Sequence, residues 1–134
     1  MNVTRLFDLI PNQLEKHPLQ VAFAGKENGK WITYSSADFK KYTDQVSFGL
    51  LAKRITPGDK IAIISNNRPE WNFTDLGVLQ IGAIDVPVYP TISENDLKFI
   101  LTDADVKIVF VSSEELYIKV KNISQNLPLR PLIY

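Results

Sequence analysis

Polar side chains follow three apolar, strand-length runs of this sequence, and they are the groups best suited to hold a ligand. Parallel strands carry their carboxyl ends at one edge of a sheet, where α/β proteins usually bind ligands. We therefore expect these side chains to meet at one edge, although helix capping is the simpler explanation for any single one of them. The set comprises Asn66, Asn67, Arg68, Tyr89, Thr91, Ser112 and Ser113.

The segment DVPVYPTISEND, residues 85–96, shows how one part of that edge is built. Each of its prolines favours an extended conformation at the residue before it, so VPVY stays extended although a proline lies inside it. Pro90 is then expected to end the strand, Thr91 to turn and Ser93 to cap a helix. This stiffness predicts that Tyr89 and Thr91 are fixed at the carboxyl edge of the sheet.

Other catalytic patterns are missing from the 134 residues. There is no Gly-x-Gly dinucleotide fingerprint, no Gly-Lys-Ser/Thr phosphate loop and no Gly-x-Ser-x-Gly nucleophile elbow. The single histidine, His17, lies between Lys16 and Pro18 and is expected to be a surface or capping residue. With one histidine and no cysteine, we expect no transition-metal site and no histidine general base. Because the chain also lacks the catalytic patterns above, we predict no catalytic residue and no metal ligand in it.

Composition narrows the classes of partner. The chain is 45% hydrophobic and 22% charged, and its formal net charge is zero. Such a balance gives no general attraction to nucleic acid, so we expect no nucleic-acid partner. No apolar run reaches the roughly 18 residues of a membrane span, and the N-terminus has no signal-peptide pattern. We expect a cytoplasmic protein, with peripheral membrane contact through an apolar patch left open.

The first part of the chain predicts helices and a hairpin. Apolar residues between Leu6 and Leu14 indicate one helix kinked at Pro11, or two short helices. The runs 21–24 and 30–34 are rich in strand formers, and GKENG between them suggests the loop of a β-hairpin. A helix capped by Ser35 or Ser36 follows. Its expected apolar stripe is Phe39, Tyr42, Val46, Gly49 and Leu50.

From residue 58 onwards, strands and helices alternate. Strands are expected at 60–65, 86–89 and 106–111 and again near 132, with helices at 69–83, 93–104 and 112–127. The last of these helices is expected to be capped by Ser112 and Glu115. Alternation of this kind predicts an α/β fold of βαβ units, and continuous apolar strands predict a parallel sheet with helices on both faces.

The chain ends within the strand-like stretch LPLRPLIY, where a polar tail or a terminal helix would be usual. We therefore expect a partial domain, truncated at its C-terminus. Residues 1–57 would form its helical and hairpin part, and residues 58–134 its βαβ sheet region.

The motifs between Gly58 and Val111, taken together, resemble the adenylate-forming (AMP-binding) enzymes, and most closely the N-terminal part of the long-chain fatty-acid–coenzyme A ligases. The family pattern is a Gly-Asp turn, an apolar strand, an Asn-x-x-Glu-Trp helix start, a small-residue helix ending in Gly-Ala, and Val-Pro-x-Tyr-Pro-Thr. The upstream WITYSSADF is also similar to the family. The matching positions are Gly58-Asp59, Ile61 to Ile64, Asn67 to Trp71, Gly82-Ala83 and Val86 to Thr91.

This resemblance implies a parent enzyme that uses ATP and magnesium to adenylate a fatty acid, and then transfers the acyl group to coenzyme A. The family's phosphate loop, adenine motif, ribose-binding Asp and catalytic lysine all lie beyond this region, and none of them occurs in the 134 residues. The chain alone is therefore expected to be inactive. In relatives, coenzyme A enters near the Tyr-Pro-Thr turn. The implied substrate-proximal rim is Tyr89, Pro90, Thr91 and Asn67.

Two other readings stay open at this point. The chain could be a stand-alone flavodoxin-like binding module, although SNNRPEW offers a poor phosphate loop because Pro69 lacks a backbone donor. It could also be a non-catalytic interaction domain. Surfaces meant for the remainder of a parent chain would be exposed, which predicts self-association of the isolated polypeptide. The identity of the acid cannot be read from these residues.

Overall fold

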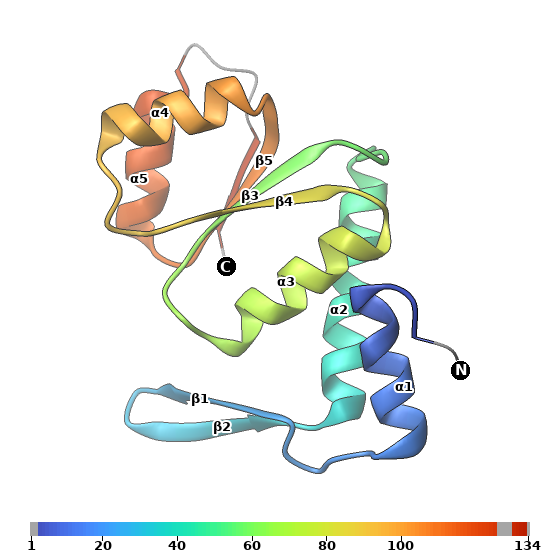
Figure 1. Cartoon of the computed structure of the whole chain (residues 1–134). Coiled ribbons are helices and arrows are strands. Elements are labelled where there is room, and N and C mark those ends of the chain that lie inside the picture. The colour runs from blue at the N-terminus through green and yellow to red at the C-terminus, as the bar shows by residue number, and fades with distance from the viewer. Residues whose placement is uncertain (1–2, 126–129, 134) are drawn as a thin grey trace. The chain divides into compact units, whose positions relative to one another are not determined.

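The computed structural model (Figure 1) describes residues 3–125 and 130–133. The chain forms two compact units, each assembled from separate stretches of sequence. The first unit contains Met1–Ile55 and Arg68–Ile81, and the second contains Thr56–Asn67 and Gly82–Tyr134.

Two short helices open the first unit. A 3₁₀ turn, η1 (Leu6–Asp8), leads directly into α1 (Leu9–Lys16). Pro11 is tolerated because it lies in the first turn of α1, where backbone N–H groups have no partner within the helix. His17 ends α1 and is exposed, which confirms the expected capping position.

The hairpin that follows differs from its prediction in the loop. β1 (Phe23–Glu27) and β2 (Lys30–Tyr34) pair antiparallel, with Glu27 opposite Lys30. The predicted loop GKENG is therefore wrong, because the first strand continues to Glu27 and only Asn28 and Gly29 make the turn. Both have positive φ, 48° and 80°, which is the requirement of a tight I′ hairpin turn and the reason that Asn-Gly is favoured there.

The long helix α2 (Ser36–Ala52) is capped by Ser35, whose Oγ accepts a hydrogen bond from the Asp38 N–H at 3.1 Å. Its predicted apolar positions Phe39, Val46 and Leu50 are buried. Gly49 is exposed, so its predicted place in the apolar stripe is wrong.

Thr43 and Ser47 take two further buried positions on α2, where α3 (Pro69–Gln80) packs closely against it. A Cβ atom at Gly77 of α3 would lie 2.7 Å from the Val46 side chain. Ser47, buried beside Thr43, donates to the Gly77 carbonyl at 2.9 Å. No residue of α3 is exposed, as its apolar sequence predicts.

An aromatic core joins the elements of this unit. Ile10, Phe39 and Phe73 are buried together, and Phe23 and Tyr34 of the hairpin pack against them. The Phe39 and Phe73 ring centroids are 5.4 Å apart, and those of Tyr34 and Phe73 are 5.1 Å apart.

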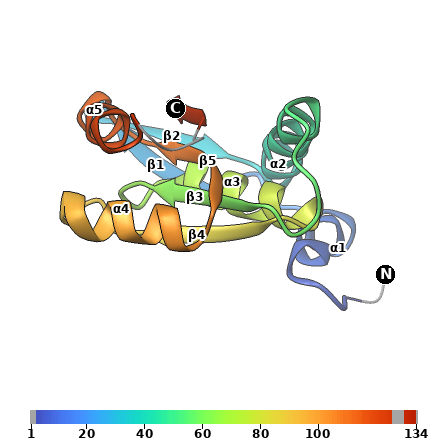
Figure 2. The same cartoon turned by 90° about the horizontal axis from the view of Figure 1, so that it is seen from above.

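The second unit is built on a parallel sheet with the strand order β4-β3-β5-β6. Figure 2 shows β5, β3 and β4 side by side. The strands are β3 (Lys60–Ile64), β4 (Ile84–Val88), β5 (Val106–Val111) and β6 (Arg130–Ile133). The parallel sheet is confirmed, although β4 and β6 each begin two residues before their predicted starts. β4 is an edge strand in this order, which explains how it accommodates Pro87.

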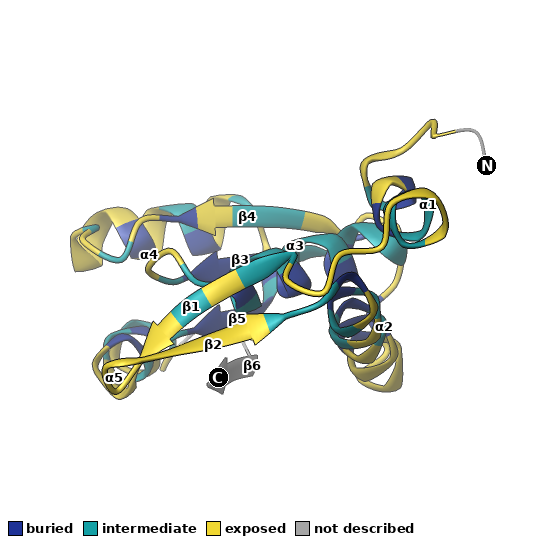
Figure 3. Ribbon diagram, turned by 90° about the horizontal axis from the view of Figure 1, so that it is seen from below, coloured by how far each residue is buried: buried dark blue, intermediate teal, exposed yellow. Residues whose placement is uncertain are grey.

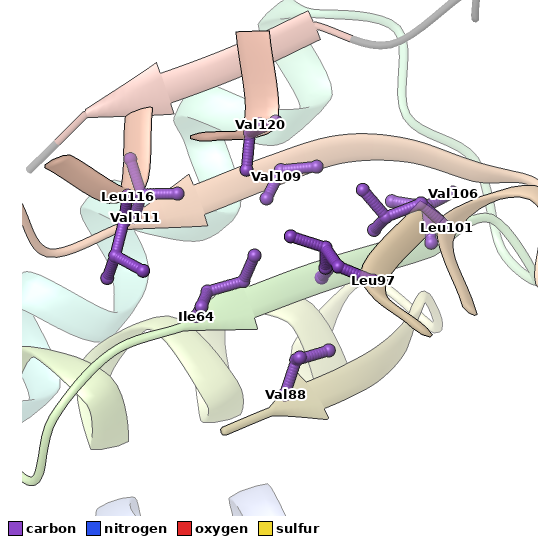
Figure 4. Packing of buried hydrophobic residues seen from close by; sticks show 10 residues of the cluster. Ile64, Val88, Leu97, Leu101, Val106, Val109, Val111, Leu116 and Val120 are labelled. Atoms are coloured by element: carbon purple, nitrogen blue, oxygen red, sulfur yellow. The ribbon is translucent and has the colours of Figure 1, made fainter. Parts of the chain in front are cut away.

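Two helices, α4 (Glu94–Asp103) and α5 (Glu114–Ile123), lie side by side against one face of this sheet. Figure 4 shows their buried side chains meeting those of the strands. Ile61, Ile63 and Ile108, whose side chains belong to the opposite face, are also buried. The prediction of helices on both faces stays a prediction for that second face. The cluster comprises Ala62, Ile64, Val88, Leu97, Leu101, Val106, Val109, Val111, Leu116 and Val120.

The caps of α4 and α5 separate a correct prediction from a wrong one. Ser93 caps α4 as expected, accepting from the Asp96 N–H at 3.1 Å. Ser113, not Ser112, caps α5, because the latter's N–H still pairs with the Ile64 carbonyl at the end of β5. α5 ends at Ile123, four residues before the predicted end at Leu127, which itself lies outside the described residues. No described helix is long and apolar enough to cross a bilayer.

Candidate ligand-binding edge

The carboxyl ends of β3, β4 and β5 form one edge of the second unit. The Ser112 N–H donates to the Ile64 carbonyl at 3.2 Å and so joins the ends of β5 and β3. Because β4 also pairs with β3 in parallel, the residues after all three strands belong to the same edge, as the sequence predicts. Exposed polar side chains follow each strand: Asn66 and Asn67, Tyr89 and Thr91, and Ser113.

The Tyr-Pro-Thr turn presents its side chains outward. β4 ends at Val88, and the Ile92 N–H returns to the Tyr89 carbonyl at 3.2 Å to close a turn around Pro90 and Thr91. The Tyr89 side chain is 84% exposed. Tyr89, Thr91 and Asn67 are thus accessible groups on the edge, whereas Pro90 is half-buried within the turn.

A lysine that no sequence pattern identifies forms a hydrogen bond to this turn. Lys119, in the middle of α5, donates from its Nζ to the Ile92 carbonyl. A charged donor on a carbonyl is among the stronger hydrogen bonds in proteins. Lys119 therefore ties the β4–α4 turn to α5, a contact that needs the two helices side by side and that no local motif reveals.

Several members of the predicted set have structural roles. Ser113 Oγ accepts from the Leu116 N–H at 3.2 Å, so helix capping explains it. Ser65, at the end of β3, donates to the Asn66 carbonyl at 2.7 Å. The prediction that Tyr89, Pro90, Thr91 and Asn67 approach a substrate stays a prediction.

Arg68 is engaged in the first unit and is removed from the candidate group. Its Nε lies 2.7 Å from Glu70 Oε2, and its Nη2 lies 3.3 Å from Glu27 Oε1 of the hairpin. The Tyr34 hydroxyl donates to Glu70 Oε1 at 3.1 Å. These contacts tie the hairpin to the start of α3.

The ionisation of this group follows from its surroundings. Burial, reinforced by the bond to Glu70, raises the pKa of Tyr34 to about 12. Burial of Glu70 opposes its ionisation, but the hydrogen bond from Arg68 and the contacts that support it leave its pKa below the usual value. The hydrogen bond to Glu70 also raises the pKa of Arg68. At neutral pH, Tyr34 is therefore protonated, and Arg68 and Glu70 are both charged.

The described residues do not assemble a metal centre. Within 3–125 and 130–133, no three His, Cys, Asp or Glu side chains are grouped so that they could hold a metal ion. The edge offers amide, hydroxyl and phenol groups, which suit hydrogen bonding to a polar ligand rather than coordination or acid–base chemistry.

Comparison with protein families identifies the chain. The AMP-binding enzyme family matches residues 10–132. The chain belongs to this family. The match includes the hairpin, both units and the Tyr-Pro-Thr turn, and it confirms the resemblance seen in the motifs between Gly58 and Val111.

Curated relatives are long-chain acyl-coenzyme A ligases. The chain is 27% identical over 101 residues to the long-chain-fatty-acid–CoA ligase FadD15 of Mycobacterium bovis, covering 75% of this chain and 17% of the relative. It is 26% identical over 104 residues to the ligase heimdall of Drosophila melanogaster, covering 78% of this chain and 15% of the relative. It is 32% identical over 87 residues to the peroxisomal long chain acyl-CoA synthetase 6 of Arabidopsis thaliana, covering 65% of this chain and 12% of the relative. The chain thus spans less than a fifth of these relatives.

Solved structures share the fold at low sequence identity. A benzoate CoA ligase from Burkholderia xenovorans matches 98% of this chain with a TM-score of 0.82 and 13% identity, over 26% of that protein. The fatty acid AMP ligase of Legionella pneumophila matches 96% with a TM-score of 0.76 and 19% identity, over 23% of that protein.

Proposed function

We propose that this chain is part of an ATP-dependent long-chain fatty-acid–coenzyme A ligase. The observation that carries the proposal is the family match over residues 10–132, together with relatives that are named as ligases of this class. Such an enzyme joins the acid to AMP with release of pyrophosphate and then forms the thioester. ATP, magnesium, a fatty acid and coenzyme A would be its ligands.

The residues in hand do not make the nucleotide or metal site. The 134 residues contain no glycine-rich phosphate loop, and the described part has no group of metal-type side chains. No chemical step is therefore assigned to this chain alone. Its contribution is the rigid edge at Asn67, Tyr89 and Thr91, where hydroxyl and amide groups would face a substrate bound mainly by other parts of the protein.

The test compares the chain with the longer protein of which we propose it is part. The longer protein should release pyrophosphate from ATP with palmitate, and form the thioester when coenzyme A is added. The 134-residue chain should do neither, since it lacks the phosphate loop. Turnover by the chain alone would refute its proposed inactivity, and a longer protein that is inert with every carboxylic acid would refute the ligase assignment.

The proposed role of the rim can be tested in the same assay through the KM for coenzyme A. Replacing Thr91 with Ala in the longer protein should raise the KM for coenzyme A several-fold, because about one hydrogen bond to the ligand is lost. Thr102→Ala is the matched control, since that exposed hydroxyl donates to the Lys98 carbonyl within its own helix α4, at 2.7 Å. Equal KM values for both variants would remove Thr91 from the rim.

A further inference from the structure

Exposed apolar side chains gather at the C-terminal end of α2. Phe48 is 68% exposed and Leu51 is 50% exposed. They lie three residues apart and so share one face of the helix. Figure 3 shows exposed positions of α2 in yellow. Lys53 and Arg54, both exposed, follow at the helix end, and we call these four residues the α2 patch.

Arg54 has an unusual backbone conformation at the C-terminal end of α2. The Ile55 N–H bonds to the Leu50 carbonyl at 3.1 Å and the Arg54 N–H to the Leu51 carbonyl at 2.9 Å, which is the Schellman pattern of helix termination. Arg54 occupies the left-handed position of that pattern, with φ of 64°. Glycine is the residue that adopts this conformation most easily, so the chain carries a cation here at a conformational cost.

The α2 patch is locally positive within a chain of zero net charge. Asp44 is the acid of α2 that lies one turn before Phe48. Its carboxylate is already paired with Lys40 and accepts a hydrogen bond from Gln80 at 3.2 Å. Attraction of an anionic partner would therefore be local to Lys53 and Arg54 and not a property of the whole surface.

We propose that the α2 patch binds the surface of an anionic lipid bilayer. An aromatic and an aliphatic side chain on one helix face can enter the headgroup boundary, while two adjacent cations remain at the level of anionic headgroups. A symmetric contact with a second copy is disfavoured, because it would bring Lys53 and Arg54 of both copies together. This binding is additional to the proposed ligase function and does not depend on it.

The experiment is co-sedimentation of the 134-residue chain with vesicles of phosphatidylcholine, with or without phosphatidylglycerol. The chain should sediment with the phosphatidylglycerol vesicles only, and less so at high salt. The double variant Phe48→Ser, Leu51→Ser should lose binding. Lys53→Gln and Arg54→Gly should each weaken binding about fivefold, the effect of one cation near an anionic surface.

Two controls separate this role from a folding defect. Phe99 on α4 is also 68% exposed but lies one turn from the acidic residues Asp96 and Asp103, so Phe99→Ser should bind vesicles like the wild type. Arg54→Gly should raise the melting temperature, because glycine relieves the left-handed position, while it weakens vesicle binding.

Other outcomes would overturn the proposal. These are failure to bind anionic vesicles, equal binding to neutral vesicles, or equal losses from Phe99→Ser and the Phe48 double variant. A dimer in light scattering that the double variant alone dissociates would assign the α2 patch to a second copy instead.

Discussion

Tyr34 shows at the residue scale how one side chain connects distant parts of the first unit. Its ring packs edge-on against Phe73 in the aromatic core, with centroids 5.1 Å apart, while its hydroxyl reaches Glu70 at the start of α3. Arg68 then links Glu70 to Glu27 on the hairpin. The position combines buried apolar area with a charge-assisted hydrogen bond, so it should matter to stability more than an exposed ion pair does.

The raised pKa of Tyr34 predicts a specific pH dependence. The folded state favours the protonated phenol, so its contribution is complete below pH 10 and is lost as pH rises from 10 to 12. Tyr34→Phe should lower the free energy of unfolding by about 1 kcal/mol at neutral pH. The difference between wild type and variant should then shrink above pH 10, as measured by urea unfolding.

A second variant, Glu70→Gln, tests the same assignment by urea unfolding. Glu70→Gln keeps an oxygen that can accept the hydrogen bond but removes the negative charge that helps to raise the pKa of Tyr34. The alkaline loss of stability should therefore still begin near pH 10, but it should be smaller and complete at lower pH in this variant. A Tyr34→Phe difference that stays constant from pH 7 to 12 would contradict the assigned role.

At the scale of elements, the packing of α2 on α3 depends on a glycine. A Cβ at Gly77 would lie 2.7 Å from the Val46 side chain and 2.9 Å from the Thr43 carbonyl oxygen, and the backbone atom cannot move aside cheaply. Gly77→Ala should therefore destabilise the protein by about 1–3 kcal/mol, despite the better helix propensity of alanine. Thermal or urea unfolding measures the change.

Gly49 on α2 is the matched control for this prediction. It also lies within a helix, but nothing surrounds the position that its Cβ would take. Gly49→Ala should stabilise the protein by about 0.5–1 kcal/mol, since only the backbone entropy term applies. If both substitutions stabilise, the close approach of the two helices is not the constraint described.

Elements were predictable from sequence where local chemistry decides them. β5 was placed correctly because it is a continuous apolar run, and Ser93 because a cap and its first turn are local. The predicted hairpin loop is wrong because Gly25 is typical of a loop, whereas Asn28-Gly29 is the decisive turn signal. Gly25 lies in a strand close to Pro69, where a Cβ would be 2.9 Å from that ring. That reason is tertiary and cannot be read from the neighbouring residues.

The candidate edge could likewise be predicted from the order of the elements, but not the tertiary contacts that hold it. Parallel topology places residues after β3, β4 and β5 at one edge, and this was deduced from the alternation of elements. The Lys119 contact to Ile92 was not, because it depends on the packing of α5 beside α4. Arg68 follows Asn67 directly but belongs to the other unit, a division that adjacency in sequence conceals.

At the scale of the whole molecule, the chain exposes apolar surface well away from the α2 patch in sequence. Leu6 is 66% exposed and Leu9 is 52% exposed, three residues apart at the start of the first unit, and Val3 precedes them. An apolar strip of this kind is typical of a surface that packs against another part of a protein. The chain covers less than a fifth of its curated relatives, so further protein is available to cover the strip in a longer chain.

We therefore expect the isolated 134-residue chain to self-associate through this strip. Light scattering should give a mean mass that rises with protein concentration, because burial of exposed leucines is favourable by about 25 cal/mol per Å². Leu6→Ser with Leu9→Ser should restore the monomer, whereas Phe48→Ser with Leu51→Ser should leave association unchanged. A wild-type chain that remains monomeric at high concentration would contradict the prediction. If the Phe48 double variant alone dissociates the oligomer, the contact lies on α2 and not on this strip.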